Sequence, residues 1–102
     1  MQSANLVYPI YAIQGISTCR EVLRPTDWAQ RFAGNFSTFD KGRIQYSKHI
    51  YPSTIENVTS LICDSFIEEA YPLFWKEIMA FAKNNCLIIF IKNDPFSDFT
   101  VL

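Results

Sequence analysis

Few side chains in this sequence could act as nucleophiles or as general acids and bases. His49 is the only histidine, and the cysteines are Cys19, Cys63 and Cys86. A cysteine nucleophile needs a base or a positive charge beside it, and the only such hint is Arg20 next to Cys19. A pairing of Cys19 with His49 would require their two segments to be adjacent. An enzyme that uses Cys19 is therefore our third hypothesis, and we assign no catalytic residue.

Carboxylates and metal-ligating residues give no clearer signal. The adjacent Glu68 and Glu69 could serve acid–base chemistry, but both precede a predicted helix, whose amino end favours acidic residues. The three cysteines form no Cys-x-x-Cys pair, so they predict neither a zinc site nor a disulfide framework. The sequence also lacks a glycine-rich phosphate loop. We therefore expect no metal ion and no cofactor.

The most prominent cluster of charged and aromatic residues comprises Arg20, Arg24, Trp28, Arg31 and Arg43. Arg24 directly precedes a predicted helix, whose first backbone N–H groups favour anions. An anionic ligand or an acidic patch of a partner could dock there. Alternatively, the arginine side chains lie over Trp28 and pair with Glu21 and Asp27. Both interpretations stay open at this point.

The net charge of −1 conceals an uneven distribution along the chain. Residues 1–51 carry six basic and three acidic side chains, and residues 52–102 carry three basic and seven acidic ones. A chain so close to neutral is not typical of a protein that grips nucleic acid. A basic and an acidic region on one molecule can nevertheless steer a charged partner.

The elements that must position these residues follow from the spacing of apolar side chains. Strands are predicted at 6–16, 19–23, 43–51, 58–66 and 86–91, with a loop at 52–57. One helix begins after Thr26 as its N-cap and buries Trp28 and Phe32. A second helix has Pro72 near its start and an apolar stripe at helical spacing.

These elements predict an α+β fold with the order β-β-α-β-β-α-β and two helices packed on a mainly antiparallel sheet. Without the first strand, the order is the ferredoxin-like β-α-β-β-α-β. RNA-recognition domains share that order and stack bases on aromatic residues of their third strand. The corresponding strand 58–66 has one aromatic residue and no Lys or Arg, so the RNA interpretation fails there.

The length of 102 residues predicts a single domain, 1–102, with a core at about 7–92 and a tail at 93–102. We expect the tail to strap the core, because Phe96 and Phe99 are costly to leave in water. Addition of the tail to a partner's sheet edge is the alternative.

The amino end has no basic, apolar signal sequence, and the longest apolar run, 86–91, is far shorter than the ~20 residues of a membrane helix. Unpaired cysteines favour a reducing compartment. We therefore expect a cytoplasmic protein without membrane contact, as a monomer or weak homodimer.

Three stretches carry a family resemblance: IQG at 13–15, LRPTDWAQR at 23–31 and MAFAKNN at 79–85. Together they resemble domain-of-unknown-function family 3579, a group of small, mostly proteobacterial proteins. The likeness spans about residues 10–92. It implies a compact α+β domain in the bacterial cytoplasm and supplies no function. It does single out Gln14, Arg24, Asp27, Trp28 and Arg31.

The candidate binding residues are therefore Gln14, Arg20, Arg24, Asp27, Trp28, Arg31 and Arg43. Our leading hypothesis is a non-enzymatic accessory or regulatory domain. It would bind a protein partner, so far unknown, through the first helix and the basic strand around Arg43. The alternative is an anionic small molecule at the same place, with nucleic acid as the less favoured ligand.

Overall fold

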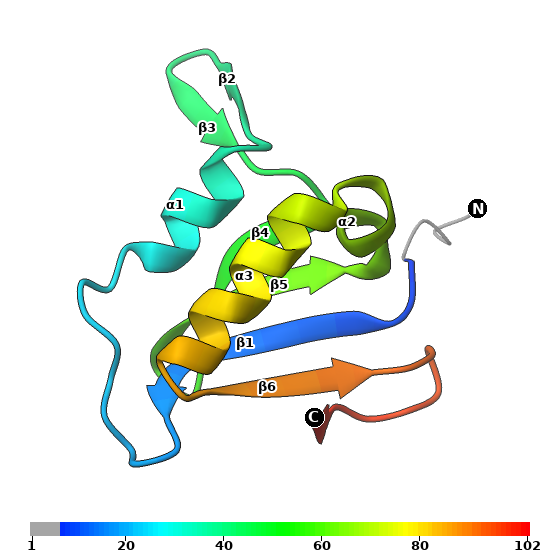
Figure 1. Ribbon diagram of the computed structural model, residues 1–102. Coiled ribbons are helices and arrows are strands. Elements are labelled where there is room, and N and C mark those ends of the chain that lie inside the picture. Colours follow the sequence, from blue (N-terminus) through cyan, green and yellow to red (C-terminus); the bar gives the residue numbers. More distant parts are fainter. Residues whose placement is uncertain (1–6) are drawn as a thin grey trace.

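The computed structural model describes residues 7–102, which fold into a sheet with helices on one face (Figure 1). The elements in chain order are β1 (Ile10–Ser17), α1 (Trp28–Gly34), β2 (Thr38–Asp40), β3 (Arg43–Gln45), β4 (Ile50–Ile55), β5 (Val58–Asp64), α2 (Ser65–Ala70), α3 (Pro72–Asn84), β6 (Leu87–Lys92) and β7 (Thr100–Val101). The expected α+β class is confirmed. Residues 1–6, on which part of the predicted strand 6–16 falls, lie outside the described range.

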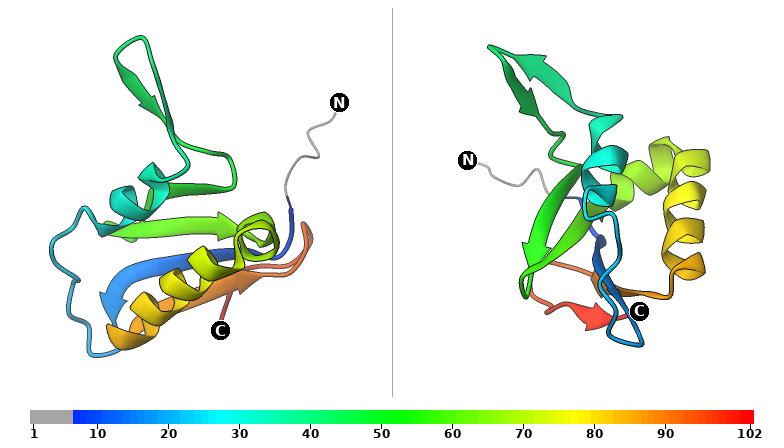
Figure 2. Two further views of the ribbon diagram at one scale, coloured as in Figure 1. Left: turned by 45° about the horizontal axis from the view of Figure 1, so that its top comes forward. Right: turned by 90° about the vertical axis from the view of Figure 1, so that its left-hand side faces the viewer.

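One antiparallel sheet holds five of the strands in the order β4-β5-β1-β6-β7. β1 lies in its middle, where Ile10 pairs with Asp64 of β5 on one side and with Lys92 of β6 on the other. This central place explains why residues 11–16 are all buried. The helices cover one face of the sheet, and β2 and β3 form a separate hairpin that projects beyond it (Figure 2).

The hydrophobic core lies between the sheet and the helices. Ile13 and Leu61 from neighbouring strands and Ile78 from α3 are fully buried there. Ala29 and Ala33 of α1 are buried as well, and their small side chains let this helix sit close to the sheet. The predicted apolar stripe of the second helix is thus the face that α3 turns to the core.

The predicted strand 19–23 is wrong. The chain turns after β1, with Arg20 at a φ of 68°, and only one bridge, between Ile16 and Val22, joins the return segment to β1. The physical reason is that β5 pairs with β1 only as far as Gln14, which leaves a free edge of about three residues. The returning segment bonds to that short edge through the Leu23 N–H to the Gly15 carbonyl and the Ser17 N–H to the Glu21 carbonyl, both at 2.9 Å, and it is too short there to form a strand. The first predicted strand, which was expected to be additional to the β-α-β-β-α-β order, is the central strand β1, and the strand 19–23 is absent from the described residues.

The predicted strand 43–51 and loop 52–57 are also corrected. Residues 43–45 form β3 of the projecting hairpin, and a new strand, β4, begins at Ile50 and includes Pro52. β4 is the edge of the sheet, where a residue without an N–H is tolerated. The real turn is at Glu56 and Asn57, which both have positive φ, as a two-residue hairpin connection requires.

The helical region after β5 holds two helices where one was expected. α2 includes Glu68 and Glu69, and α3 starts at Pro72. Asp64 caps α2, because its carboxylate accepts a hydrogen bond from the Phe66 N–H at 3.0 Å. The chain thus has three helices among its described residues, so the expectation of two is wrong.

The tail returns along its own sheet. Thr100 and Val101 pair with Ile91 and Phe90 of β6, and the Leu102 N–H donates to the Ile89 carbonyl at 2.8 Å. The sheet therefore gains its fifth strand from residues that show no period in the sequence.

Candidate functional site

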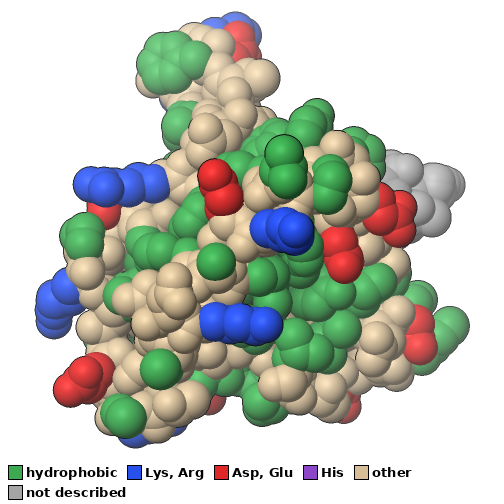
Figure 3. Space-filling model, in the orientation of Figure 1, with side chains coloured by type: hydrophobic (Ala, Val, Ile, Leu, Met, Phe, Trp, Pro, Cys, Tyr) green, Lys and Arg blue, Asp and Glu red, His purple; other side chains and the backbone are tan. Residues whose placement is uncertain are grey.

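A pocket of about 480 Å³ lies between α1 and α3, and we call it the α1–α3 pocket. It is lined by Leu23, Arg24, Pro25, Trp28, Arg31, Phe32, Asn35, Phe74, Glu77, Phe81 and Asn85. Figure 3 shows hydrophobic side chains open to solvent in the hollow between these helices, with charged side chains around it. The pocket combines an apolar floor with a few polar groups.

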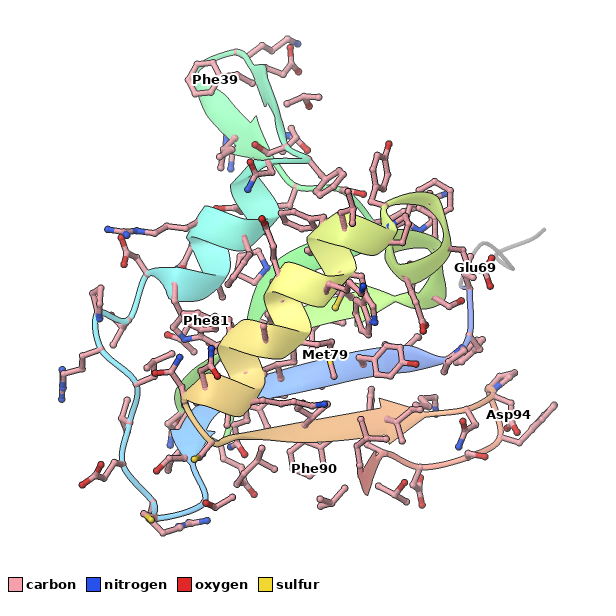
Figure 4. The ribbon with its side chains drawn as sticks, viewed as in Figure 1. Phe39, Glu69, Met79, Phe81, Phe90 and Asp94 are labelled. Carbon is pink, nitrogen blue, oxygen red and sulfur yellow. The ribbon has the colours of Figure 1, made fainter. Side chains whose placement is uncertain are left out.

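The floor of the α1–α3 pocket is a network of aromatic rings. Trp28 stacks on Phe81 with ring centroids 5.5 Å apart, and Phe81 points from α3 toward α1 (Figure 4). Phe32 meets Phe81 edge-on at 5.2 Å and Phe74 at 6.0 Å. The start of α1 therefore lies beside the end of α3, and the end of α1 beside its start. This antiparallel arrangement fixes where each polar group stands.

Three charged side chains line the pocket. The Arg31 Nε lies 3.2 Å from Asp27 Oδ2, one turn earlier on α1, so that charge already has a partner. Within residues 7–102, no carboxylate lies within 4 Å of the Arg24 guanidinium, and Glu77 of α3 has no basic partner at that distance. The Leu23 N–H donates to the carbonyl of Gly15, which lies against Trp28, so the neighbouring Arg24 is at the Trp28–Phe81 end of the pocket. Glu77 lies between Phe74 and Phe81 on α3.

The structure brings together three of the seven predicted binding residues. Arg24, Trp28 and Arg31 line the α1–α3 pocket, and Asp27 joins them through its ion pair with Arg31. The alternative interpretation, in which arginines pair with nearby acids, holds for Arg31.

The other predicted residues lie elsewhere. Arg20 is exposed in the turn after β1, and Arg43 is exposed on the hairpin. Gln14 is buried on β1, and its amide donates to the Ile55 carbonyl at 3.3 Å and to Glu56 Oε1 at 3.4 Å. It therefore ties the β4–β5 turn to the sheet, and none of these three lines the pocket.

Sequence reasoning missed the contribution of α3 to this pocket. Phe74 and Phe81 belong to the apolar stripe of the second predicted helix, yet both are half-buried and line the opening. The signal was present, because Glu77 interrupts the aromatic face at helical spacing between them. A charged residue within an apolar stripe indicates a rim and not a core.

Cys19 and His49 do not form a catalytic pair. His49 binds Asp64, which pairs with Ile10 at the start of β1, whereas Cys19 follows Ser17 at the far end. Seven strand steps place these ends about 23 Å apart. The His49 Nδ1 lies 2.7 Å from Asp64 Oδ2 and its ring stacks on Phe66, so this pair joins the start of β4 to α2.

The described residues show neither a cluster of metal ligands nor a membrane-spanning helix. Residues 7–102 contain no group of three or more His, Cys, Asp or Glu side chains that could hold a metal ion. None of the helices described is both long enough and apolar enough to cross a membrane.

Comparison with known proteins gives the family. A family described as a protein of unknown function (DUF3579) matches residues 9–91. This chain belongs to that family. A solved solution structure, described as the first structural representative of its family, is similar over 98% of this chain and 91% of its own, with 25% identity and a TM-score of 0.69. No curated protein matches. Membership in the DUF3579 family thus supplies the fold and leaves the function open.

Proposed function

We propose that this member of the DUF3579 family is a non-enzymatic accessory domain that binds a protein partner through the β2–β3 hairpin. The observation that carries the proposal is the exposure of Phe39 and Ile44. These residues pair across the hairpin, and 75% and 48% of their surfaces are exposed. Phe39 stands near the tip, away from the sheet and helices (Figure 4).

The cross-strand contact of Phe39 with Ile44 stabilises the hairpin by only about 0.2–1 kcal/mol. An isolated hairpin is marginally stable in water at best, and all six strand residues of this one are exposed. Burying two large apolar side chains contributes about 1.5–3 kcal/mol for each. A partner that covers Phe39 and Ile44 would supply that burial and order the hairpin.

The charge of the hairpin indicates what the partner offers. Lys41 and Arg43 flank the glycine of the turn and outnumber the one acid, Asp40. An apolar hollow with acidic residues at its rim complements this surface. Arg43, the basic residue of the original hypothesis, thereby enters a different surface from Arg24 and Arg31.

A bacterial, cytoplasmic setting is part of the proposal. Cys19 and Cys86 are free and exposed, and exposed free thiols persist in a reducing compartment.

The test is affinity purification from the native cell followed by mass spectrometry. The wild-type chain is compared with Phe39→Ser/Ile44→Ser and with the control Leu73→Ser. Leu73 has the same kind of exposure, 77%, but lies on α3. We expect a protein that the wild type and Leu73→Ser retain and that the hairpin variant loses.

Sedimentation of the purified wild type distinguishes a foreign partner from a second copy. A foreign protein and a second copy of this chain are both consistent with the proposal, provided that the hairpin variant abolishes the binding. Retention of every partner by Phe39→Ser/Ile44→Ser would contradict the proposal.

A further inference from the structure

We propose that the α1–α3 pocket binds a small molecule with a flat aromatic body and a single carboxylate. The observations on this pocket are independent of those on the hairpin, so the inference holds whether or not a protein binds the hairpin. The inference starts from size. A volume of about 480 Å³ falls inside the range of about 300–1,000 Å³ that is typical of small-molecule sites.

The aromatic floor selects the body of the ligand. Trp28, Phe32, Phe74 and Phe81 are arranged as stacked and edge-on pairs, and aromatic rings attract further rings in the same geometries. Trp28 is held firmly, with 4% of its surface exposed, while the three phenylalanines are half-buried. Their accessible surface is where a flat ring would lie.

The polar groups select the charge and its position. Arg24 has no acidic partner among the described residues, and its planar guanidinium suits a carboxylate bound through two hydrogen bonds. Asn85, the C-cap of α3, lines the same end of the pocket, but its side-chain amide already donates to the Phe81 carbonyl at 2.9 Å, so Arg24 is the group that selects the charge. Glu77 lies eight residues earlier, about 12 Å along the helix axis. A carboxylate at the Arg24 end therefore avoids Glu77.

The same arrangement argues against a strongly charged ligand. Asp27 already engages Arg31, and Glu77 adds a negative charge to the wall. The exposed Arg24 is therefore the arginine of the lining that has no ion pair and can turn toward a ligand. A single negative charge matches this site, whereas a phosphate-rich ligand would meet the carboxylate of Glu77.

The experiment uses 1-naphthoate as the probe and the full chain labelled with nitrogen-15. Amide and indole resonances are followed by NMR while the probe is added to about 5 mM, because a ligand of this size binds in about the micromolar to millimolar range. We expect saturable shifts confined to residues around the α1–α3 pocket, including the Trp28 indole. The neutral 1-naphthamide should bind about tenfold more weakly, since it lacks the charge.

Two variants test the role assigned to Arg24. Arg24→Gln should weaken 1-naphthoate binding about tenfold and leave 1-naphthamide unaffected. Arg20→Gln is the matched control, because Arg20 is an exposed arginine of the same connection that does not line the pocket. Both side chains are exposed, so both variants should keep the wild-type spectrum outside the pocket.

Three results would overturn the inference. They are no saturable shift with 1-naphthoate, equal binding of the acid and the amide, and equal loss in Arg24→Gln and Arg20→Gln. None of them bears on the hairpin.

Discussion

The indole of Trp28 lies against the backbone of Gly15 on the central strand. A Cβ atom at position 15 would stand 2.8 Å from Trp28 Nε1 and 2.4 Å from the Thr59 carbonyl oxygen. Glycine is therefore the residue that lets α1 approach the sheet at this point. The Nε1 atom is buried and has no hydrogen-bond partner among the described residues, so close packing is what holds this ring.

Gly15→Ala should destabilise the protein by about 1–3 kcal/mol, because the added methyl group overpacks a site walled by backbone and by a buried ring. Gly34→Ala is the control, since a Cβ there meets nothing within 4 Å. Gly34 is the last residue of α1, and alanine should stabilise it by about 0.5–1 kcal/mol. Urea unfolding measures both. Equal effects of the two substitutions would show that Gly15 and Trp28 are not in close contact.

The phenol of Tyr11 should lose its proton at a higher pH than an ordinary tyrosine. Burial raises the pKa of Tyr11 above its ordinary value near 10, and the charge of Glu68, whose Oε1 accepts from the phenol at 3.3 Å, raises it further. The folded state therefore favours the neutral phenol. This contribution to stability is complete below about pH 10 and is lost as the pH rises through the pKa of the folded state.

Ultraviolet difference titration should show a phenol transition above pH 10 that disappears in Tyr11→Phe. In Glu68→Gln the pKa of Tyr11 should fall and yet stay above the ordinary value, because burial is the larger cause. A return to the ordinary value in Glu68→Gln would show that burial contributes nothing.

The three thiols should differ in reactivity. Burial raises the pKa of the Cys63 thiol, with a smaller effect from the neighbouring Asp64 and Glu68 carboxylates, so its reactive thiolate is suppressed. Cys19 and Cys86 are exposed. A thiol reagent should therefore modify these two in the native protein and Cys63 only after denaturation. Rapid modification of Cys63 under native conditions would contradict its placement in the core.

Removal of residues 95–102 should lower the thermal midpoint. The deletion takes away β7 and Phe99, which lies beside Ala12 and Phe90 in a second hollow of about 390 Å³. A point-mutation pair separates packing from length. Phe99→Ser should destabilise the protein, whereas Phe96→Ser should have little effect, since 95% of Phe96 is exposed and 44% of Phe99. An unchanged midpoint in the deletion would exclude the strap.

The sequence predicted the elements whose residues face one uniform environment. β5, β6 and the long helix α3 show their apolar patterns plainly, because each turns apolar side chains toward the core. β4 was missed, since its Pro52 signals a loop unless the strand is known to lie at an edge. Edge position is a property of the assembled sheet and leaves no local mark.

The sequence pointed to the α1 side of the pocket but not to its α3 side. Arg24, Trp28 and Arg31 lie close together in the chain, so their meeting in one pocket follows from a single helix and its lead-in. The spacing of Phe74 and Glu77 marks a break in the apolar face of α3. It does not say that this face lies beside α1, because that depends on how two helices distant in sequence pack. Gln14 was selected by family resemblance, and its contacts are those of a structural residue.

The separateness of the hairpin has a consequence for how the chain could be divided. Trypsin cleavage at Lys41 and Arg43 would leave one piece with β1 and another with β5 and β6, the strands that flank it. Since β1 is hydrogen-bonded on both sides, the nicked chain should run as one particle on a sizing column and as two bands on a denaturing gel. The fragment that carries β1 could then be supplied as a separate polypeptide and complete the sheet formed by the other fragment.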